Sequence, residues 1–82
     1  MISQTEQNIL RLLFNTPMIR GVEIVHALKI DVFVLVEAVQ LLCKKNLINQ
    51  PLLVNNVKST LVSHYYIVPS CVNRAKQLAG LS

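Results

Sequence analysis

The segment that decides the fold is residues 21–48, which read GVEIVHALKIDVFVLVEAVQLLCKKNLI. Apolar residues at a spacing of three predict a short helix at about residues 21–28, since such residues share one side of a helix; they are Val22, Val25 and Leu28. Asp31 predicts a longer helix that runs to about Lys45, because its carboxylate can accept from the free amides at the helix start. The residues of this longer helix that fall on one arc, and that we expect in the core, are Leu35, Ala38, Val39 and Leu42.

Elements on both sides of this segment extend the pattern. Ser3-Gln4-Thr5-Glu6 fits a capping box and predicts a helix over about residues 4–14. A short apolar strand at 18–20 then leads into the segment. At its other end, Asn46 is expected to take a left-handed C-cap, after which Leu47-Ile48 re-enters the core.

Beyond Ile48 the hydrophobic period changes to two. Leu52-Leu53-Val54 and the stretch from Thr60 to Val68 are rich in β-branched and aromatic residues, and they predict two strands of a β-hairpin with a polar tip at 55–59. Tyr65 and Tyr66 would point to opposite faces of the second strand, so we expect one in the core and one exposed.

Ser70 is positioned to cap a last helix, Cys71 to Ala79, which ends at Gly80. Because a chain this small has apolar residues to spare, we expect this helix to pair two copies as a homodimer; the candidate interface residues are Val72, Ala75, Leu78 and Leu81. No linker or repeat divides the chain, and residues 1–82 are therefore expected to form one domain.

Composition excludes several classes of protein. With 52% hydrophobic residues the chain is too apolar to be disordered. Its longest apolar run, Val32 to Val36, is far shorter than the roughly 20 residues that span a bilayer. We see no secretory signal and expect a cytoplasmic protein.

The two cysteines, Cys43 and Cys71, form no CxxC pair, and together with the two isolated histidines they have no metal-ligand spacing. We therefore expect reduced thiols, no metal and no cofactor.

The charge is unevenly distributed along the chain. Residues 1–40 carry a net charge of −1, whereas residues 41–82 carry five basic side chains and no acidic one. This asymmetry suggests an anionic partner for the second half, although solubilising charge alone gives the same pattern. The four acidic residues form no pair on a helix face, and Gly21 and Gly80 are the only glycines, so there is no phosphate loop. We therefore expect neither an enzyme nor a small-molecule substrate.

The order of elements resembles that of the winged helix-turn-helix family. The resemblance is carried by residues 22–31, VEIVHALKID, and by residues 42–48, LCKKNLI, where Asn46 stands in place of the family's usual glycine. It implies an α+β fold with a three-helix core, a β-hairpin wing and a C-terminal helix. It also implies a dimeric transcription regulator that binds double-stranded DNA, with the third helix in the major groove and the wing on the phosphate backbone.

The resemblance also implies which residues would meet DNA: Arg20, Phe33, Val36, Glu37, Gln40, Lys44, Lys45 and Lys58. Gln40 could pair with adenine and Lys44 with phosphate or guanine, whereas Glu37 would accept only from cytosine. Phe33 and Val36 could touch thymine methyl groups, but an exposed Phe33 beside Val36 is also typical of a protein-binding patch. Two alternatives stay open: a non-catalytic interaction module whose third helix docks a protein partner, and a helix rotated so that Phe33 belongs to the core.

Overall fold

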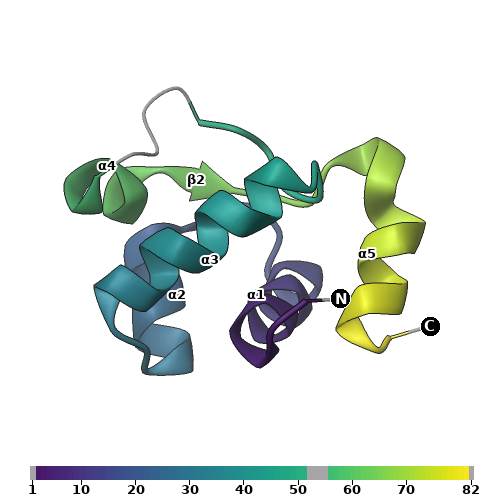
Figure 1. The fold of residues 1–82 in the computed structure, drawn as a ribbon, viewed down its shortest axis with the longest axis horizontal. Helices are drawn as coiled ribbons and strands as arrows, with labels where there is room; N and C mark the ends of the chain where they lie inside the picture. The colour runs from purple at the N-terminus through teal and green to yellow at the C-terminus, as the bar shows by residue number, and fades with distance from the viewer. Residues whose placement is uncertain (1, 52–55, 82) are drawn as a thin grey trace.

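The computed structural model describes residues 2–51 and 56–81. The chain forms a small α+β domain in which helices surround a short antiparallel sheet (Figure 1). In chain order the elements are α1 (Gln4–Asn15), β1 (Ile19–Arg20), α2 (Gly21–Leu28), α3 (Val32–Lys44), α4 (Val57–Val62), β2 (His64–Tyr65), the 3-10 helix η1 (Pro69–Cys71) and α5 (Val72–Ala79).

Local signals in the sequence set the start of α1 and both ends of α3. The amide of Glu6 donates to Ser3 Oγ at 3.2 Å and the amide of Ser3 donates back to Glu6 Oε1 at 3.2 Å, which confirms the capping box of α1. The amide of Phe33 donates to the Asp31 carboxylate at 2.7 Å and so caps α3. Asn46 has φ 60°, as expected for a left-handed residue after the helix.

The sheet brings together segments that lie far apart in the chain. β1 pairs with β2 in antiparallel register, with Ile19 opposite Tyr65. An isolated bridge joins Ile48 to Ile67, flanked by the amide of Asn49 donating to the Tyr66 carbonyl at 3.1 Å and that of Val68 to the Leu47 carbonyl at 3.0 Å. Since successive backbone groups of a strand point to opposite sides, residues 47–49 and β1 lie on opposite edges of the segment 64–68.

The predicted hairpin is wrong over residues 57–62, which form α4. The Asn56 side chain accepts from the amide of Ser59 at 2.8 Å, and Thr60 Oγ1 donates to the Asn56 carbonyl at 2.7 Å. These bonds provide an N-cap that favours a helix over the strand expected from the β-branched residues. The arm that precedes α4 and pairs with the second strand is 47–49; the predicted first arm, residues 52–54, lies outside the described residues.

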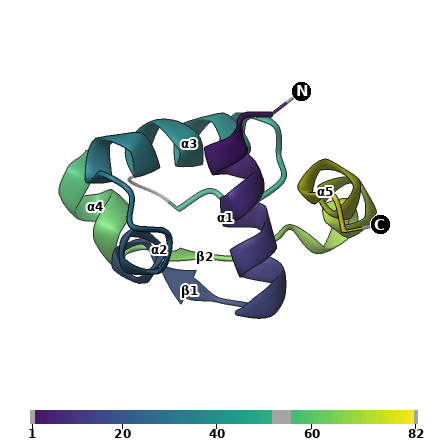
Figure 2. The same cartoon turned by 90° about the horizontal axis from the view of Figure 1, so that it is seen from below.

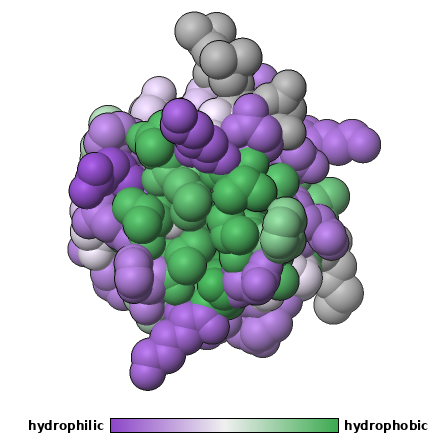
Figure 3. Space-filling view, turned by 90° about the vertical axis from the view of Figure 1, so that its left-hand side faces the viewer, coloured by the Kyte–Doolittle hydropathy of each residue, from purple (hydrophilic) through white to green (hydrophobic). Residues whose placement is uncertain are grey.

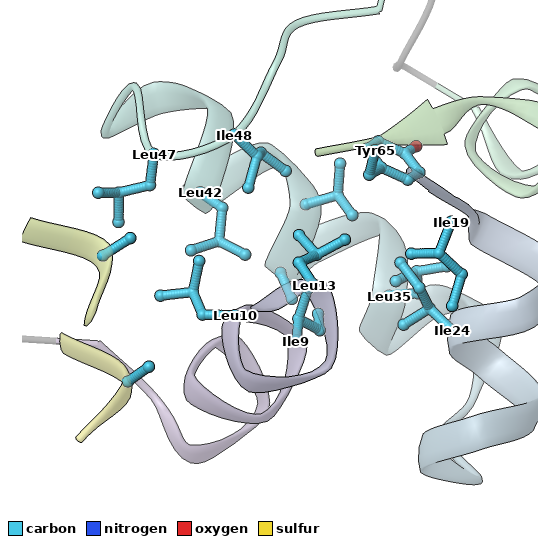
Figure 4. Close-up of a cluster of buried hydrophobic side chains, with 14 residues drawn as sticks. Ile9, Leu10, Leu13, Ile19, Ile24, Leu35, Leu42, Leu47, Ile48 and Tyr65 are labelled. Carbon is cyan, nitrogen blue, oxygen red and sulfur yellow. The ribbon is translucent and has the colours of Figure 1, made fainter. Parts of the chain in front are cut away.

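One apolar core fills the space between the sheet and helices α1, α2 and α3 (Figure 4). The four residues predicted on the inner arc of α3 are all buried: Leu35, Ala38, Val39 and Leu42. Tyr65 is fully buried and Tyr66 is exposed, which confirms the expected division of the two tyrosines.

α5 packs beside α1, on the side of the domain away from α2 and α4 (Figures 1 and 2). Gln7 Nε2 donates to the Leu78 carbonyl at 3.1 Å and Arg11 Nε donates to the Ala79 carbonyl at 2.6 Å, so α1 binds the carbonyl end of α5. Gly80 ends the helix in the left-handed region, as predicted. Ser70 does not cap it, because Ser70 lies inside η1 and α5 begins at Val72 without a side-chain cap.

Candidate interaction surface

The outward face of α3 carries a large exposed aromatic side chain. Phe33 is 69% exposed, so the rotation that places it away from the core is correct. Glu37, Gln40 and Lys44 follow it along the same exposed row, and Val36 beside the row is half-buried. Because most of its side chain is exposed, the ring of Phe33 presents apolar surface to solvent.

α4 extends this apolar surface. The helix packs against both α3 and α2, and its Val62 is 61% exposed. Figure 3 views the molecule from the side where α2, the start of α3 and α4 lie in Figure 1, and hydrophobic side chains form a continuous area there with a hydrophilic rim. We call this the apolar face. The apolar residues of these three helices that we assign to it, none of them fully buried, are Val25, Leu28, Val32, Phe33, Val36, Leu61 and Val62.

Lys45, one of the residues predicted to contact DNA, forms an ion pair within the domain. Its Nζ lies 2.9 Å from Glu6 Oε2, and the Glu6 side chain is only 3% exposed. Burial by itself would raise the pKa of Glu6, but the hydrogen bonds from Lys45 and Ser3 outweigh it and hold that pKa below its ordinary value. The ion pair therefore joins the end of α3 to the start of α1.

Arg20 also has an acidic neighbour. Its Nε lies 3.4 Å from Glu23 Oε1, and the Arg20 amide donates to the same oxygen at 3.1 Å. That backbone hydrogen bond, with the guanidinium beside it, lowers the pKa of the Glu23 carboxyl. Arg20 thus helps to organise the start of α2, and its charge is partly compensated.

Lys44 and Lys58 are exposed, and no ion pair within the described residues involves either of them. Lys58 was predicted at a hairpin tip, but it lies in the first turn of α4. The eight predicted DNA-binding residues are therefore not equivalent. Lys44 and Lys58 keep their full charge toward solvent, whereas Lys45 and Arg20 share theirs with carboxylates.

A small cavity of about 270 Å³ lies beside the C-terminal half of α3, lined by Gln40, Cys43, Lys44, Gln50 and Pro51. Cys43 Sγ lies 3.3 Å from the Asn49 carbonyl, and burial raises the pKa of the thiol. A thiol held protonated in this way is a poor nucleophile and a poor metal ligand. Within the described ranges, no cluster of three His, Cys, Asp or Glu side chains is placed to hold a metal ion.

The residues predicted to pair two copies through α5 are mostly used inside the domain. Ala75 is fully buried against the core, where it is not accessible to a second chain, and Leu78 packs against the same core. Val72 is half-buried, and only Leu81, at 45%, is strongly exposed. The apolar side of α5 therefore serves mainly to attach the helix to α1.

Sequence reasoning identified Phe33 and Val36 but missed Leu61 and Val62, because it assigned them to a strand. Asn56 directly before the apolar Val57 was the available signal for a helix start at this point. Comparison of the chain with protein-family models, curated proteins and solved structures gave no significant match. In the part of the chain that the structure describes, no helix has both the length and the apolar character that crossing a bilayer requires.

Proposed function

We propose that this chain is a non-catalytic protein-interaction domain of winged-helix architecture, which docks a protein partner on its apolar face. The observation that carries the proposal is the exposure of Phe33 and Val62, at 69% and 61%, on two helices that pack together at the side of the molecule where Figure 3 shows a continuous hydrophobic area. Soluble domains keep large contiguous apolar patches mainly where they bind something. Aromatic side chains are also enriched at the centres of protein interfaces.

The arrangement of the sheet supports the winged-helix part of the proposal. The chain runs through three helices with β1 after the first, returns along 47–49, and then passes between that segment and β1 as residues 64–68. Two arms joined by a loop after the third helix are what a wing consists of. In this chain the loop carries α4, which packs against α2 and α3 instead of extending as a simple hairpin.

The chemistry of the outward face favours a protein partner over DNA. Base edges and phosphates are recognised by hydrogen-bonding and cationic groups, and the exposed row of α3 begins with Phe33 and continues with the acidic Glu37. Lys45 and Arg20, two of the cations expected at DNA, lie beside carboxylates.

A photo-crosslinking residue at position 33 tests the proposal in cells that express the chain. We expect protein adducts from position 33 and none from position 77, an exposed position on α5 that serves as the control. Adding Val62→Asp should abolish the adducts while thermal unfolding stays nearly unchanged, because exposed substitutions usually change stability by less than about 0.5 kcal/mol. Equal adducts at both positions, or adducts with nucleic acid alone, would contradict the proposal.

Binding to DNA is the second candidate, favoured by one specific observation. Lys44 lies on the same exposed row as Gln40, and the exposed Lys58 on α4 adds a further uncompensated charge in the basic half of the chain. Such cations can neutralise phosphates irrespective of base sequence. The salt dependence of duplex binding tests this candidate and is argued in the Discussion.

A further inference from the structure

We propose that the groove between α3 and the start of α1 binds a partner-protein segment that presents an apolar side chain beside one lysine or arginine. The start of α1 lies next to α3 (Figure 2), and a cavity of about 230 Å³ opens between them. We call this cavity the α1–α3 groove; its lining residues are Ser3, Thr5, Val34, Glu37, Ala38 and Leu41. By helical periodicity Val34 and Leu41 lie nearly opposite Val36 around α3, so the groove is a separate site from the apolar face.

The floor of the groove is an apolar stripe along α3. Ala38 is 4% exposed, and the larger side chains of Val34 and Leu41, at 42% and 38%, lie one turn before and one turn after it. A side chain inserted between these two removes apolar surface of both from water, which is favourable. The cavity is smaller than the roughly 300–1,000 Å³ pockets that hold small molecules, so one side chain of a longer segment fits it better than a cofactor does.

A single carboxylate determines the charge of the groove. Glu37 is exposed, and its side chain forms no ion pair and no hydrogen bond within the described residues. The other three acidic side chains all have partners: Glu6 binds Lys45, Glu23 binds Arg20, and Asp31 caps α3. Among the described residues, no basic one lines the groove. The groove is therefore complementary to a lysine or arginine, whose methylene stem can pack on Leu41 while its charged head reaches Glu37.

The charges around the groove limit the partner to one basic side chain. Lys44 lies two turns after Glu37 with its full charge toward solvent, and Lys45 is bonded to Glu6. The whole chain carries +4, so a strongly basic segment is repelled by the surrounding surface. A mainly apolar segment with one lysine or arginine avoids that repulsion. On the α1 wall, the hydroxyls of Ser3 and Thr5 can bond the backbone of such a segment.

Selection from a random peptide library displayed on phage, with the whole chain immobilised, tests the proposal. We expect the enriched peptides to share an apolar residue within one helical turn of a single lysine or arginine. A synthetic copy of an enriched peptide should shift the amide NMR signals of residues 3–5 and 34–41 and leave those of α4 unchanged. No enrichment, or enriched peptides without a basic residue, would overturn the proposal.

Variants of the chain test the charge and the apolar floor separately. Glu37→Gln should weaken the affinity for that peptide severalfold, because it removes the carboxylate, and Leu41→Ser should weaken it about tenfold, because it removes part of the floor. Gln77→Lys, at an exposed position on α5, raises the net charge by the same amount as Glu37→Gln and should leave the affinity unchanged. Circular dichroism establishes that each variant is folded.

A charge exchange provides the sharper readout. Glu37→Lys should abolish binding of the peptide, and replacing the peptide's basic residue by glutamate should restore it. An affinity that neither Glu37→Gln nor Leu41→Ser lowers would overturn the proposal. A peptide that is lost with Phe33→Ser and kept with Leu41→Ser binds the apolar face; that result would overturn the groove site and still support the proposed function.

Discussion

Gly21 lies directly against the backbone carbonyl of Thr60, and a Cβ added at position 21 would collide with that oxygen. The amide of Gly21 also donates to the Ser63 carbonyl at 3.0 Å, and Tyr65 Oη donates to the Thr60 carbonyl at 3.0 Å. The start of α2 and the second half of α4 are thus in backbone contact. Because α4 carries Leu61 and Val62 of the apolar face, this contact fixes the position of that part of the candidate site.

Gly21→Ala should therefore destabilise the domain. The added methyl group meets backbone atoms, which cannot rotate away, so we expect a loss of about 1–3 kcal/mol or more from overpacking. Urea unfolding measures the change. Ala27→Ser, on the exposed side of the same helix, should stay within about 0.5 kcal/mol, and an equally small loss for Gly21→Ala would contradict the close packing of α4.

The pair of Glu6 and Lys45 predicts a specific dependence of stability on acid. Lys45→Met leaves a buried carboxylate without its cation and should cost about 1–3 kcal/mol near neutral pH. The pKa of Glu6 in the folded chain lies below its ordinary value of 4.5, so its stabilising contribution is present above pH 4.5 and is lost as the pH falls through the folded pKa.

The difference between the wild type and Lys45→Met should consequently shrink in acid, where Glu6 is protonated in both chains. Free energies of unfolding measured at pH 7 and at decreasing pH values check this. Lys44→Met is the matched control, because Lys44 forms no ion pair within the described residues and should behave like the wild type. A difference that is constant with pH would show that Lys45 stabilises by packing alone.

The helices that could be predicted from the sequence are those whose signals are local. Ser3 and Glu6 lie three residues apart, and Asp31 and Phe33 lie two apart. The order of residue types along the chain is therefore enough to predict these capping hydrogen bonds. The same is true of the outward direction of Phe33, which follows from helical periodicity once Asp31 fixes the start of α3.

What the sequence did not reveal depends on contacts between distant residues. Val57–Val62 has the β-branched composition of a strand. Besides the local N-cap at Asn56, α4 is held by the packing of its Thr60 backbone against Gly21, far earlier in the chain. The sequence also does not show the ion pair of Lys45, because its partner Glu6 lies 39 residues earlier in the chain. Neither of these two contacts joins residues at a characteristic spacing, so neither can be predicted from a single sequence.

Tyr65 predicts a loss of stability in alkali. Burial, partly offset by hydrogen bonding with the side chains of Ser63 and Thr60, raises the pKa of Tyr65 to about 12 from an ordinary value of 10.0. The unfolded chain therefore loses its tyrosine proton first, so this contribution is complete below pH 10.0 and is lost as the pH rises toward about 12. Tyr65→Phe should lack this part of the alkaline loss, whereas Tyr66→Phe, at an exposed position, should retain it; denaturant titrations between these pH values provide the comparison.

Arg11 predicts how firmly α5 is attached. Its Nε donates to the Ala79 carbonyl at 2.6 Å, at the end of a helix of eight residues, which is too short to be stable alone. Arg11→Leu should accelerate hydrogen exchange of the α5 amides several-fold and leave those of α2 and α3 unchanged, since the core between them is not altered. Gln4→Leu, exposed on the same helix, is the control, and uniform acceleration in all helices would instead indicate global destabilisation.

The salt dependence of duplex binding decides how much the basic half of the chain contributes to DNA recognition. If Lys44 and Lys58 contact phosphates, the affinity for mixed-sequence duplex falls steeply between two salt concentrations, and each alanine substitution lowers the slope of log affinity against log salt by about one. Arg20→Ala should have a smaller effect, because Glu23 already compensates part of its charge. Fluorescence anisotropy with a labelled duplex measures all three slopes. Binding that is absent, or that does not depend on salt, would exclude the DNA candidate and leave the apolar face of α3 and α4 as the functional surface of the chain.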